Sequence, residues 1–511
     1  MRAPMLLRAA ATGVILAAVH GCSSTPAPAP APAPVVTPTP TPPVAEAAPA
    51  PLIDTVPPVL GPAPSVTLPP IDRRTLPNGM TLLVVEQHEL PVADFVLVVG
   101  SGTEADPAAH GGLASLTASL LREGTTTRSA TALADQLSFL GASLFATSGW
   151  DMSQVALHTT TAQMDSALAL FADVVQRPAF AAADVDRLKK QRLTDLLQAR
   201  DRPRDIADRV YAQMLYGTAH PYGRPPMGTE QSTTAITRSD IRRFYDTYYR
   251  PNNATLIVVG DVTPADVERR ARALLGSWPR RAVPQTKYPA SSMTAAKPTI
   301  YLVDKPGAPQ SSIRIGDIGV ARSTPDYFAL MVMNTILGGS FTSRLNQNLR
   351  EKRGYTYGAG SGFTMRRQPG PFTARAEVTG TKTDSSLIEF MNELRSIRDT
   401  VSSAELARAK RYLELQLPGE FETTSSIASQ LVPVVVHNLP LDFYSSYVQQ
   451  IEQVTQADIR RVAQRYVDPA KMAIVVVGDR ASIEPGIRAL NLGDVSVRDL
   501  NGAVLANPAK P

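Results

Sequence analysis

The residue types most often used in catalysis are few in this chain and lie far apart. The six histidines stand at positions 20, 88, 110, 158, 220 and 437, and the closest pair is 22 residues apart (110 − 88 = 22). Two histidines that share one metal ion on a helix lie one turn apart, so the sequence holds no local two-histidine motif. It also lacks a G-x-S-x-G elbow and a phosphate-binding glycine loop. We interpret His110 as a surface or capping residue and His220 as a loop residue.

The one cysteine, Cys22, ends a short apolar segment near the N-terminus. Arg2 and Arg8 come before an apolar run over 9–19, which has the length of a signal-peptide core and is too short to span a bilayer. The V-H-G-C sequence that closes the run resembles a bacterial lipoprotein signal, although His20 is unusual there. An ordinary secretory signal with a chance cysteine is the alternative.

The lipoprotein resemblance implies a location for the protein. It makes 1–22 a signal peptide with a lipidated Cys22, and several acyl chains on one cysteine give stable membrane anchoring. Ser23, in place of an aspartate, implies an outer membrane lipoprotein that faces the periplasm of a Gram-negative bacterium. The proline- and alanine-rich segment 23–72 favours polyproline II and predicts a semi-rigid stalk.

The distribution of charge does not identify a binding partner. The formal net charge is +5, and the clearest basic stretch is 187–204. Most such stretches are solvated helix faces, which is our interpretation, with ligand steering as the alternative. We expect no nucleic-acid partner. No apolar run after the signal segment is long enough for a transmembrane helix.

The chain repeats itself once. Residues 237–261 and 455–479 align without a gap at an offset of 218 (455 − 237 = 218). In each copy a threonine precedes a helix, a proline ends it, and an apolar run closes in V-V-G-D, which predicts a capped helix and then a buried strand. A repeat of this length indicates two homologous halves rather than a solenoid. The expected divisions are a first half over 73–282, a linker over 283–297, a second half over 298–490 and a tail over 491–511.

Strands mixed with runs of helices predict an α+β fold in which each half layers helices on an antiparallel-rich sheet. In the first half we predict a strand over 93–102 and helices over 111–122, 130–140, 162–176, 183–200 and 204–215. In the second half we predict strands over 299–304, 311–317 and 371–379, and helices over 325–337, 341–351, 383–400, 403–416 and 422–430.

Three stretches resemble the insulinase-like peptidases, the group of pitrilysin and the mitochondrial processing peptidase. They are G-L-A-S-L-T-A-S-L-L-R-E-G-T at 112–125, Y-R-P-N-N-A-T-L at 249–256, and L-G-G-S-F-T-S-R-L at 337–345 with L-R-E-K-R-G-Y-T-Y at 349–357. The resemblance extends over nearly all of 73–490. It implies that the two halves form a clam-shell.

The first of these stretches departs from the zinc motif of the family. Active members carry H-x-x-E-H, in which two histidines bind zinc, the glutamate is the general base and a distant glutamate is the third ligand. The same positions here hold Ser115, Ala118 and Ser119. No glutamate occurs in 124–229, and Asp195 is the one candidate for a third ligand. We therefore expect no metal ion in this chain.

The last stretch keeps a pair that the family uses on its substrate. An arginine and a tyrosine seven residues apart bind the peptide at the zinc and stabilise charge on the attacked carbonyl oxygen. The spacing gives Arg350 and Tyr357 (357 − 350 = 7), with Tyr355 as a competing tyrosine. In the alternative interpretation, Arg350 pairs with a neighbouring carboxylate and Tyr357 is a strand-edge aromatic.

Together these features imply a non-catalytic subunit of an insulinase-like zinc peptidase. It would form a heterodimer with a zinc-bearing homologue, which holds the zinc, and supply Arg350 and Tyr357 in trans. An unfolded peptide substrate would add as a strand along 142–146, the expected sheet edge. A peptide-binding or structural pseudopeptidase without proteolysis is one alternative, and an autonomous zinc endopeptidase with atypical ligands is another.

Overall fold

The computed structural model describes residues 69–289 and 298–505. The predicted signal peptide with Cys22, nearly all of the stalk, the end of the linker and the last six residues of the tail lie outside the described residues. No helix in the described ranges combines the length and the apolar character needed to cross a bilayer.

The first half contains a six-stranded sheet in the order β1-β2-β6-β3-β5-β4. Only the β2–β6 pair is parallel. The strands are β1 (Ile71–Thr75), β2 (Thr81–Glu86), β3 (Val92–Val99), β4 (Ser143–Ser148), β5 (Ser153–Thr160) and β6 (Ala254–Gly260). The helices are α1 (Leu113–Leu120), α2 (Ala130–Phe139), α3 (Met164–Gln176), α4 (Ala182–Ala199), α5 (Pro203–Tyr216), α6 (Glu230–Ala235), α7 (Arg238–Tyr248) and α8 (Pro264–Leu275).

The second half also contains a six-stranded sheet, in the order β12-β7-β11-β8-β10-β9, in which β12–β7 and β7–β11 are parallel. The strands are β7 (Thr299–Asp304), β8 (Gln310–Ile318), β9 (Thr356–Phe363), β10 (Pro371–Thr379), β11 (Ala473–Gly478) and β12 (Asp494–Arg498). The helices are α9 (Tyr327–Asn334), α10 (Arg344–Asn346), α11 (Thr383–Ser396), α12 (Ser403–Gln416), α13 (Thr424–Val436), α14 (Tyr447–Gln453), α15 (Gln456–Tyr466) and α16 (Arg480–Ala489). Strand β12 lies within the segment predicted as a tail and pairs with β7.

The predicted α+β fold of two homologous halves is confirmed. The repeated segment forms α7 and β6 in one half and α15 and β11 in the other. The side chains of Thr237 and Thr455 accept a hydrogen bond from the backbone N–H of Asp240 and Asp458. The carboxylates of these aspartates accept one from the backbone N–H of the threonine, so both helices begin with a full capping box. β6 and β11 are buried almost throughout, as expected for central strands.

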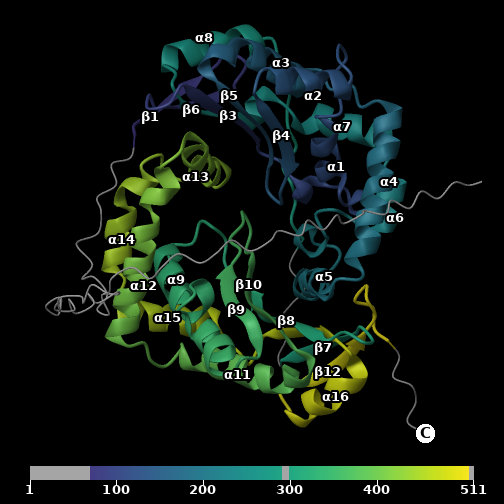
Figure 1. Cartoon of the computed structure of the whole chain (residues 1–511), viewed down its shortest axis with the longest axis vertical. Helices are drawn as coiled ribbons and strands as arrows, with labels where there is room; N and C mark the ends of the chain where they lie inside the picture. Colours follow the sequence, from purple (N-terminus) through teal and green to yellow (C-terminus); the bar gives the residue numbers. More distant parts are fainter. Residues whose placement is uncertain (1–68, 290–297, 506–511) are drawn as a thin grey trace, which may run out of the picture. The chain divides into compact units, whose positions relative to one another are not determined.

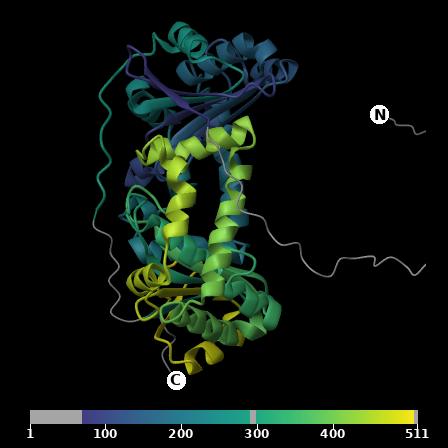
Figure 2. The same cartoon turned by 90° about the vertical axis from the view of Figure 1, so that its left-hand side faces the viewer.

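Each half sends one helix onto the sheet of the other half. α5 packs on β8 and β11, and α13 packs on β3 and β6 (Figure 1). Ile206 and Val210 of α5 share a buried cluster with Val475, whereas Ile427 and Leu431 of α13 join a cluster with strands of the first sheet. Figure 2 shows yellow-green α13 along the purple and blue strands of the first sheet. The two sheets therefore complete their cores with exchanged helices.

The prediction of a helix over 422–430 was too short, because α13 continues to Val436. Pro433 lies inside this helix, where a proline removes one backbone hydrogen bond. Val434 beyond it is buried in the cluster with the first sheet. The apolar contact with the other half stabilises a turn that the local sequence disfavours.

Candidate functional site

The degenerate zinc positions lie on α1, and their polar atoms contact the backbone. Ser115 Oγ lies 3.1 Å from the carbonyl oxygen of Gly112 and 2.9 Å from that of Pro226, so its proton is directed at the main chain. Ser119 Oγ donates to the carbonyl oxygen of Ser115 at 3.0 Å. Ala118 is fully buried. None of the three offers a side chain that zinc accepts in proteins.

The start of α1 is held by a buried carboxyl group. Asp106 accepts hydrogen bonds from the backbone N–H groups of Gly112 at 2.7 Å and Ala114 at 2.8 Å. Burial raises the pKa of Asp106 to about 7. Gly112 has φ of 89°, and a Cβ there would lie 2.5 Å from the carbonyl oxygen of Met227, so this position needs glycine.

A buried arginine of α4 contacts the start of α1. Arg192, on α4, is only 8% exposed and donates from Nη1 to the carbonyl oxygen of Gly112 at 2.8 Å. That oxygen is the one that Ser115 also contacts. Burial lowers the pKa of Arg192 to about 10, which leaves the side chain cationic at neutral pH. A fixed positive charge here opposes the binding of a divalent cation.

This finding corrects the interpretation of 187–204 as a solvated helix face. Most of the stretch is exposed or half-buried, but Arg192 is a buried contact between α4 and α1. Asp195 lies on the same helix and accepts a hydrogen bond from Gln191 Nε2 at 2.9 Å.

The donor atoms around α1 do not fit zinc. Two serine hydroxyls directed at carbonyl groups, one aspartate and a neighbouring guanidinium make a poor ligand set for this ion. Within residues 69–289 and 298–505, no cluster of three or more histidine, cysteine, aspartate or glutamate side chains is placed to hold a metal ion.

Arg350 and Tyr357 lie close together in the sequence, in a helical turn and in an edge strand of the second half. Arg350 belongs to a π-helical turn over Gln347–Lys352, and Tyr357 is the second residue of the edge strand β9. The guanidinium carbon of Arg350 is 4.7 Å from the ring centre of Phe341. Its Nε is 3.2 Å from Glu351 Oε1. Tyr357 is 89% exposed, so its hydroxyl is available to another molecule.

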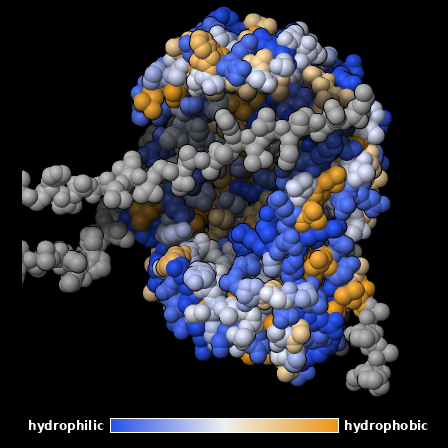
Figure 3. Space-filling model, turned by 45° about the vertical axis from the view of Figure 1, so that its right-hand side comes forward, coloured by the Kyte–Doolittle hydropathy of each residue, from blue (hydrophilic) through white to orange (hydrophobic). Residues whose placement is uncertain are grey.

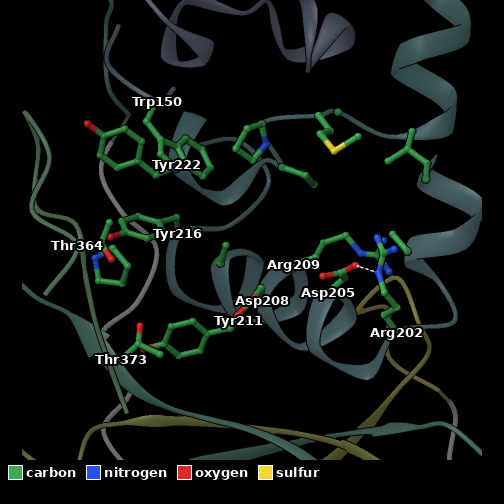
Figure 4. Close-up of a pocket in the computed structure, with 18 of the residues that line it drawn as sticks. Trp150, Arg202, Asp205, Asp208, Arg209, Tyr211, Tyr216, Tyr222, Thr364 and Thr373 are labelled. Carbon is green, nitrogen blue, oxygen red and sulfur yellow. Dashed lines mark hydrogen bonds and ion pairs between the residues drawn. The ribbon is translucent and has the colours of Figure 1, made fainter. Parts of the chain in front are cut away.

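A cavity of about 770 Å³ is lined by residues of both halves. Its lining includes Asp195 of α4, Pro226, whose carbonyl oxygen contacts Ser115, and parts of α5, β9 and β10. Figure 4 shows Trp150, Tyr216 and Tyr222 together on one side of it, and Arg202 and Asp205 on the other. The space-filling view shows a hollow with largely hydrophilic surroundings on the face turned to the viewer (Figure 3).

The tyrosines of this cavity have their hydroxyl groups engaged. Tyr211 donates to the carbonyl oxygen of Phe372 at 2.6 Å, and Tyr216 donates to that of Pro369 at 2.9 Å. Both bonds join α5 to the second half. These hydrogen bonds hold the two tyrosine rings in place in the cavity wall.

Sequence reasoning missed two arginines that shape this region, Arg192 beside α1 and Arg366 in the cavity wall. Both are 8% exposed. An arginine is usually a surface residue, and nothing in its near sequence reports burial. Their surroundings come from segments far away in the chain.

Comparisons with known proteins match both halves. The model of the insulinase family (peptidase family M16) matches residues 82–229, and the model of the peptidase M16 inactive domain matches 235–413. An uncharacterized zinc protease of Mycobacterium tuberculosis is 28% identical over 424 residues, which cover 82% of this chain and 96% of that protein.

Solved structures agree. The crystal structure of a peptidase M16 inactive domain from Pseudomonas fluorescens has a TM-score of 0.75 and 29% identity, and covers 80% of this chain and 98% of its own. A protease from Helicobacter pylori, at 21% identity, has the same fold with a TM-score of 0.75 over 81% of this chain. The family resemblance found in the sequence is thereby confirmed: the chain belongs to the insulinase family of peptidases, M16.

Proposed function

We propose that this chain is the non-catalytic subunit of an insulinase-family zinc peptidase. The proposal rests on the residues found at the zinc-motif positions of α1. At the positions that the resemblance assigns to the zinc motif, serine hydroxyls bind carbonyl groups and an alanine is buried, and the Arg192 guanidinium lies at the start of the same helix. A subunit of this kind needs a homologue that brings the zinc, and this chain would bind none itself.

The second half exposes two side chains that could act on a substrate bound to such a partner. The side chain of Tyr357 is almost fully exposed, and Arg350 is exposed enough to contact another molecule. In the proposed heterodimer both reach the peptide at the partner's zinc and stabilise negative charge on the attacked carbonyl oxygen. Their role is electrostatic and needs no metal in this chain.

The first half offers a place to hold an unfolded peptide. The predicted edge segment 142–146 lies in β4, which is at the edge of the first sheet. An edge strand has unpaired backbone groups to which an extended peptide can add. Phe145 projects from β4 with 57% exposure and gives the added strand an apolar contact.

The proposed setting is the periplasmic face of the outer membrane. A lipidated Cys22 would anchor the chain, and the proline-rich segment would hold the folded halves away from the bilayer. The peptide substrates are then those present in the periplasm.

A second candidate function is peptide capture without proteolysis. The ion pair between Arg350 and Glu351 and the contact with Phe341 favour it, since they give Arg350 a structural role within its own chain. Such a pseudopeptidase would bind the same unfolded peptides.

A reconstitution experiment separates these functions. The purified chain and its zinc-bearing homologue are assayed on a quenched fluorescent peptide, alone and mixed. We expect cleavage to rise on mixing, and Arg350→Ala in this chain to lower kcat/KM of the mixture by about 100-fold, as loss of an oxyanion donor does. Tyr357→Phe should also lower it. Arg353→Ala is the matched control, because Arg353 is a nearby half-exposed arginine that pairs with Glu389.

Two outcomes would refute the proposal. A mixture whose activity is unchanged by Arg350→Ala and Tyr357→Phe leaves only peptide capture. About one zinc per purified chain, together with cleavage by the chain alone, would establish the autonomous peptidase.

A further inference from the structure

One wall of the cavity contains a buried arginine that has no acidic partner within ion-pair distance among the described residues. Arg366 is 8% exposed and lines the cavity. Its Nε and Nη1 atoms are buried, and neither has a hydrogen-bond partner among the described residues. Buried guanidinium groups are normally paired, because an uncompensated charge away from water is unfavourable. Arg366 thus has buried, unused donors in the wall of the cavity.

Two aromatic rings fix the orientation of this guanidinium. Its central carbon lies 4.0 Å from the ring centre of Trp150 and 4.5 Å from that of Tyr222. The two rings meet edge to face at 5.7 Å (Figure 4). Cation–π contacts hold an arginine in place without occupying its N–H groups. The planar set of donors is therefore preorganised.

The nearby carboxylate of Asp151 already has partners. Its Oδ1 accepts from the hydroxyl of Tyr222 at 2.6 Å, and its Oδ2 accepts from the backbone N–H of Arg367 at 2.8 Å. Asp151 affects Arg366 only through its charge.

The rest of the cavity is also short of free carboxylates. Four arginines and three aspartates line it: 202, 209, 366 and 375, and 195, 205 and 208. Asp205 pairs with Arg202, and Asp208 binds Arg314 from outside the lining at 2.6 Å. Among the described residues, Asp195 is the one lining aspartate with no arginine within ion-pair distance. Three lining arginines also form no ion pair there: Arg209, Arg366 and Arg375. The unpaired charge in the cavity is positive.

We propose that Arg366 binds a carboxylate group of the peptide held by this chain, either the C-terminal carboxylate or an aspartate or glutamate side chain. A carboxylate compensates the charge of a guanidinium and accepts strong, charge-assisted hydrogen bonds from its N–H groups. Trp150 and Tyr222 then contact the apolar part of the same residue. This inference rests on the proposed function and adds the chemical class of peptide that is selected.

Titration calorimetry on the full chain tests the inference with three probes. They are N-acetyl-Leu-Leu-Phe as the free acid, the same peptide as the C-terminal amide, and N-acetyl-Leu-Leu-Glu amide. We expect the free acid to bind about tenfold or more tightly than its amide. Tight binding of the glutamate amide instead would assign the site to a side-chain carboxylate.

Variants locate the preference. Arg366→Gln should remove the difference between acid and amide, whereas Arg366→Lys should keep part of it through its charge. Arg395→Gln, on the exposed side of α11 and outside the cavity, is the control and should bind as the wild type does. The wild-type comparison of the three probes stands even if a variant at Arg366 folds poorly.

The outcomes distinguish this inference from the proposed function. Equal binding of all three probes by the wild-type chain, or an acid preference that survives Arg366→Gln, refutes the carboxylate site while leaving the subunit role intact. A retained acid preference with no stimulation of the zinc-bearing homologue refutes the subunit role alone. Absence of binding by every probe refutes the carboxylate site, and stimulated cleavage then reports separately on the subunit role.

Discussion

Replacing Arg314 with alanine is expected to lower the free energy of unfolding by about 3 kcal/mol. Arg314 lies on β8 with 1% exposure, and its guanidinium binds Asp208 of α5 at 2.6 Å and Glu377 of β10 at 3.1 Å. It therefore ties the exchanged helix of the first half to the second sheet. Both carboxylates reach solvent, which places the loss at the lower end of the range for buried ion pairs.

Urea unfolding followed by circular dichroism measures this effect. Arg73→Ala is the control, since Arg73 is exposed on β1, and its change should stay within about 0.5 kcal/mol. Arg314→Met should cost less than Arg314→Ala, because the apolar stem keeps its packing. Equal stability of Arg314→Ala and the wild type would mean that this ion pair does not secure α5.

The second large effect is a dependence of stability on pH through Glu104. This side chain is 3% exposed, and its Oε2 accepts the backbone N–H of Gly102 at 2.7 Å. Burial, with the charge of Asp151 as a second cause, raises the pKa of Glu104 from 4.5 to about 8. Arg367, 3.8 Å away, opposes the shift in part. The folded state thus favours the protonated carboxyl.

The sign of the effect follows from linkage. Stabilisation by the protonated form is complete below the ordinary pKa of a glutamate and is lost as the pH rises through about 8. We expect the free energy of unfolding to fall by about 4 kcal/mol between about pH 5 and about pH 9, since one pKa unit corresponds to about 1.36 kcal/mol. The raised pKa of Asp106 adds a change of the same sign.

Glu104→Gln isolates the contribution of this group. The glutamine stays neutral and still accepts the N–H of Gly102, so its stability curve should be flatter and should lie above the wild-type curve at alkaline pH. Glu89→Gln, at an exposed position, should leave the curve unchanged. Parallel curves for the wild type and Glu104→Gln would show that Glu104 titrates normally in the folded chain.

The parts of the fold that the sequence predicts well depend on residues that are close to one another in the chain. Thr237 and Thr455 are capping residues three positions before an acidic partner, and the apolar runs after them are long enough to report central strands. The lack of zinc ligands at Ser115, Ala118 and Ser119 can also be seen directly, because those ligands belong to one helical turn.

The missed features depend on contacts between distant segments. Arg366 meets Trp150 across 216 residues of sequence (366 − 150 = 216), and its neighbours in the chain do not indicate the aromatic pair. Arg192 stands in a basic run that is typical of an exposed helix. The pattern of α5 shows that the helix has a buried side, but not that the sheet it covers belongs to the other half.

The crossing of α5 and α13 between the sheets bears on how such a chain arises. A single ancestral half would leave one sheet face bare and one helix without a surface to cover, so it would not be stable alone. Two copies would solve both problems by trading helices as an intertwined homodimer. Gene duplication followed by fusion would then make that trade permanent and allow the two halves to diverge in sequence.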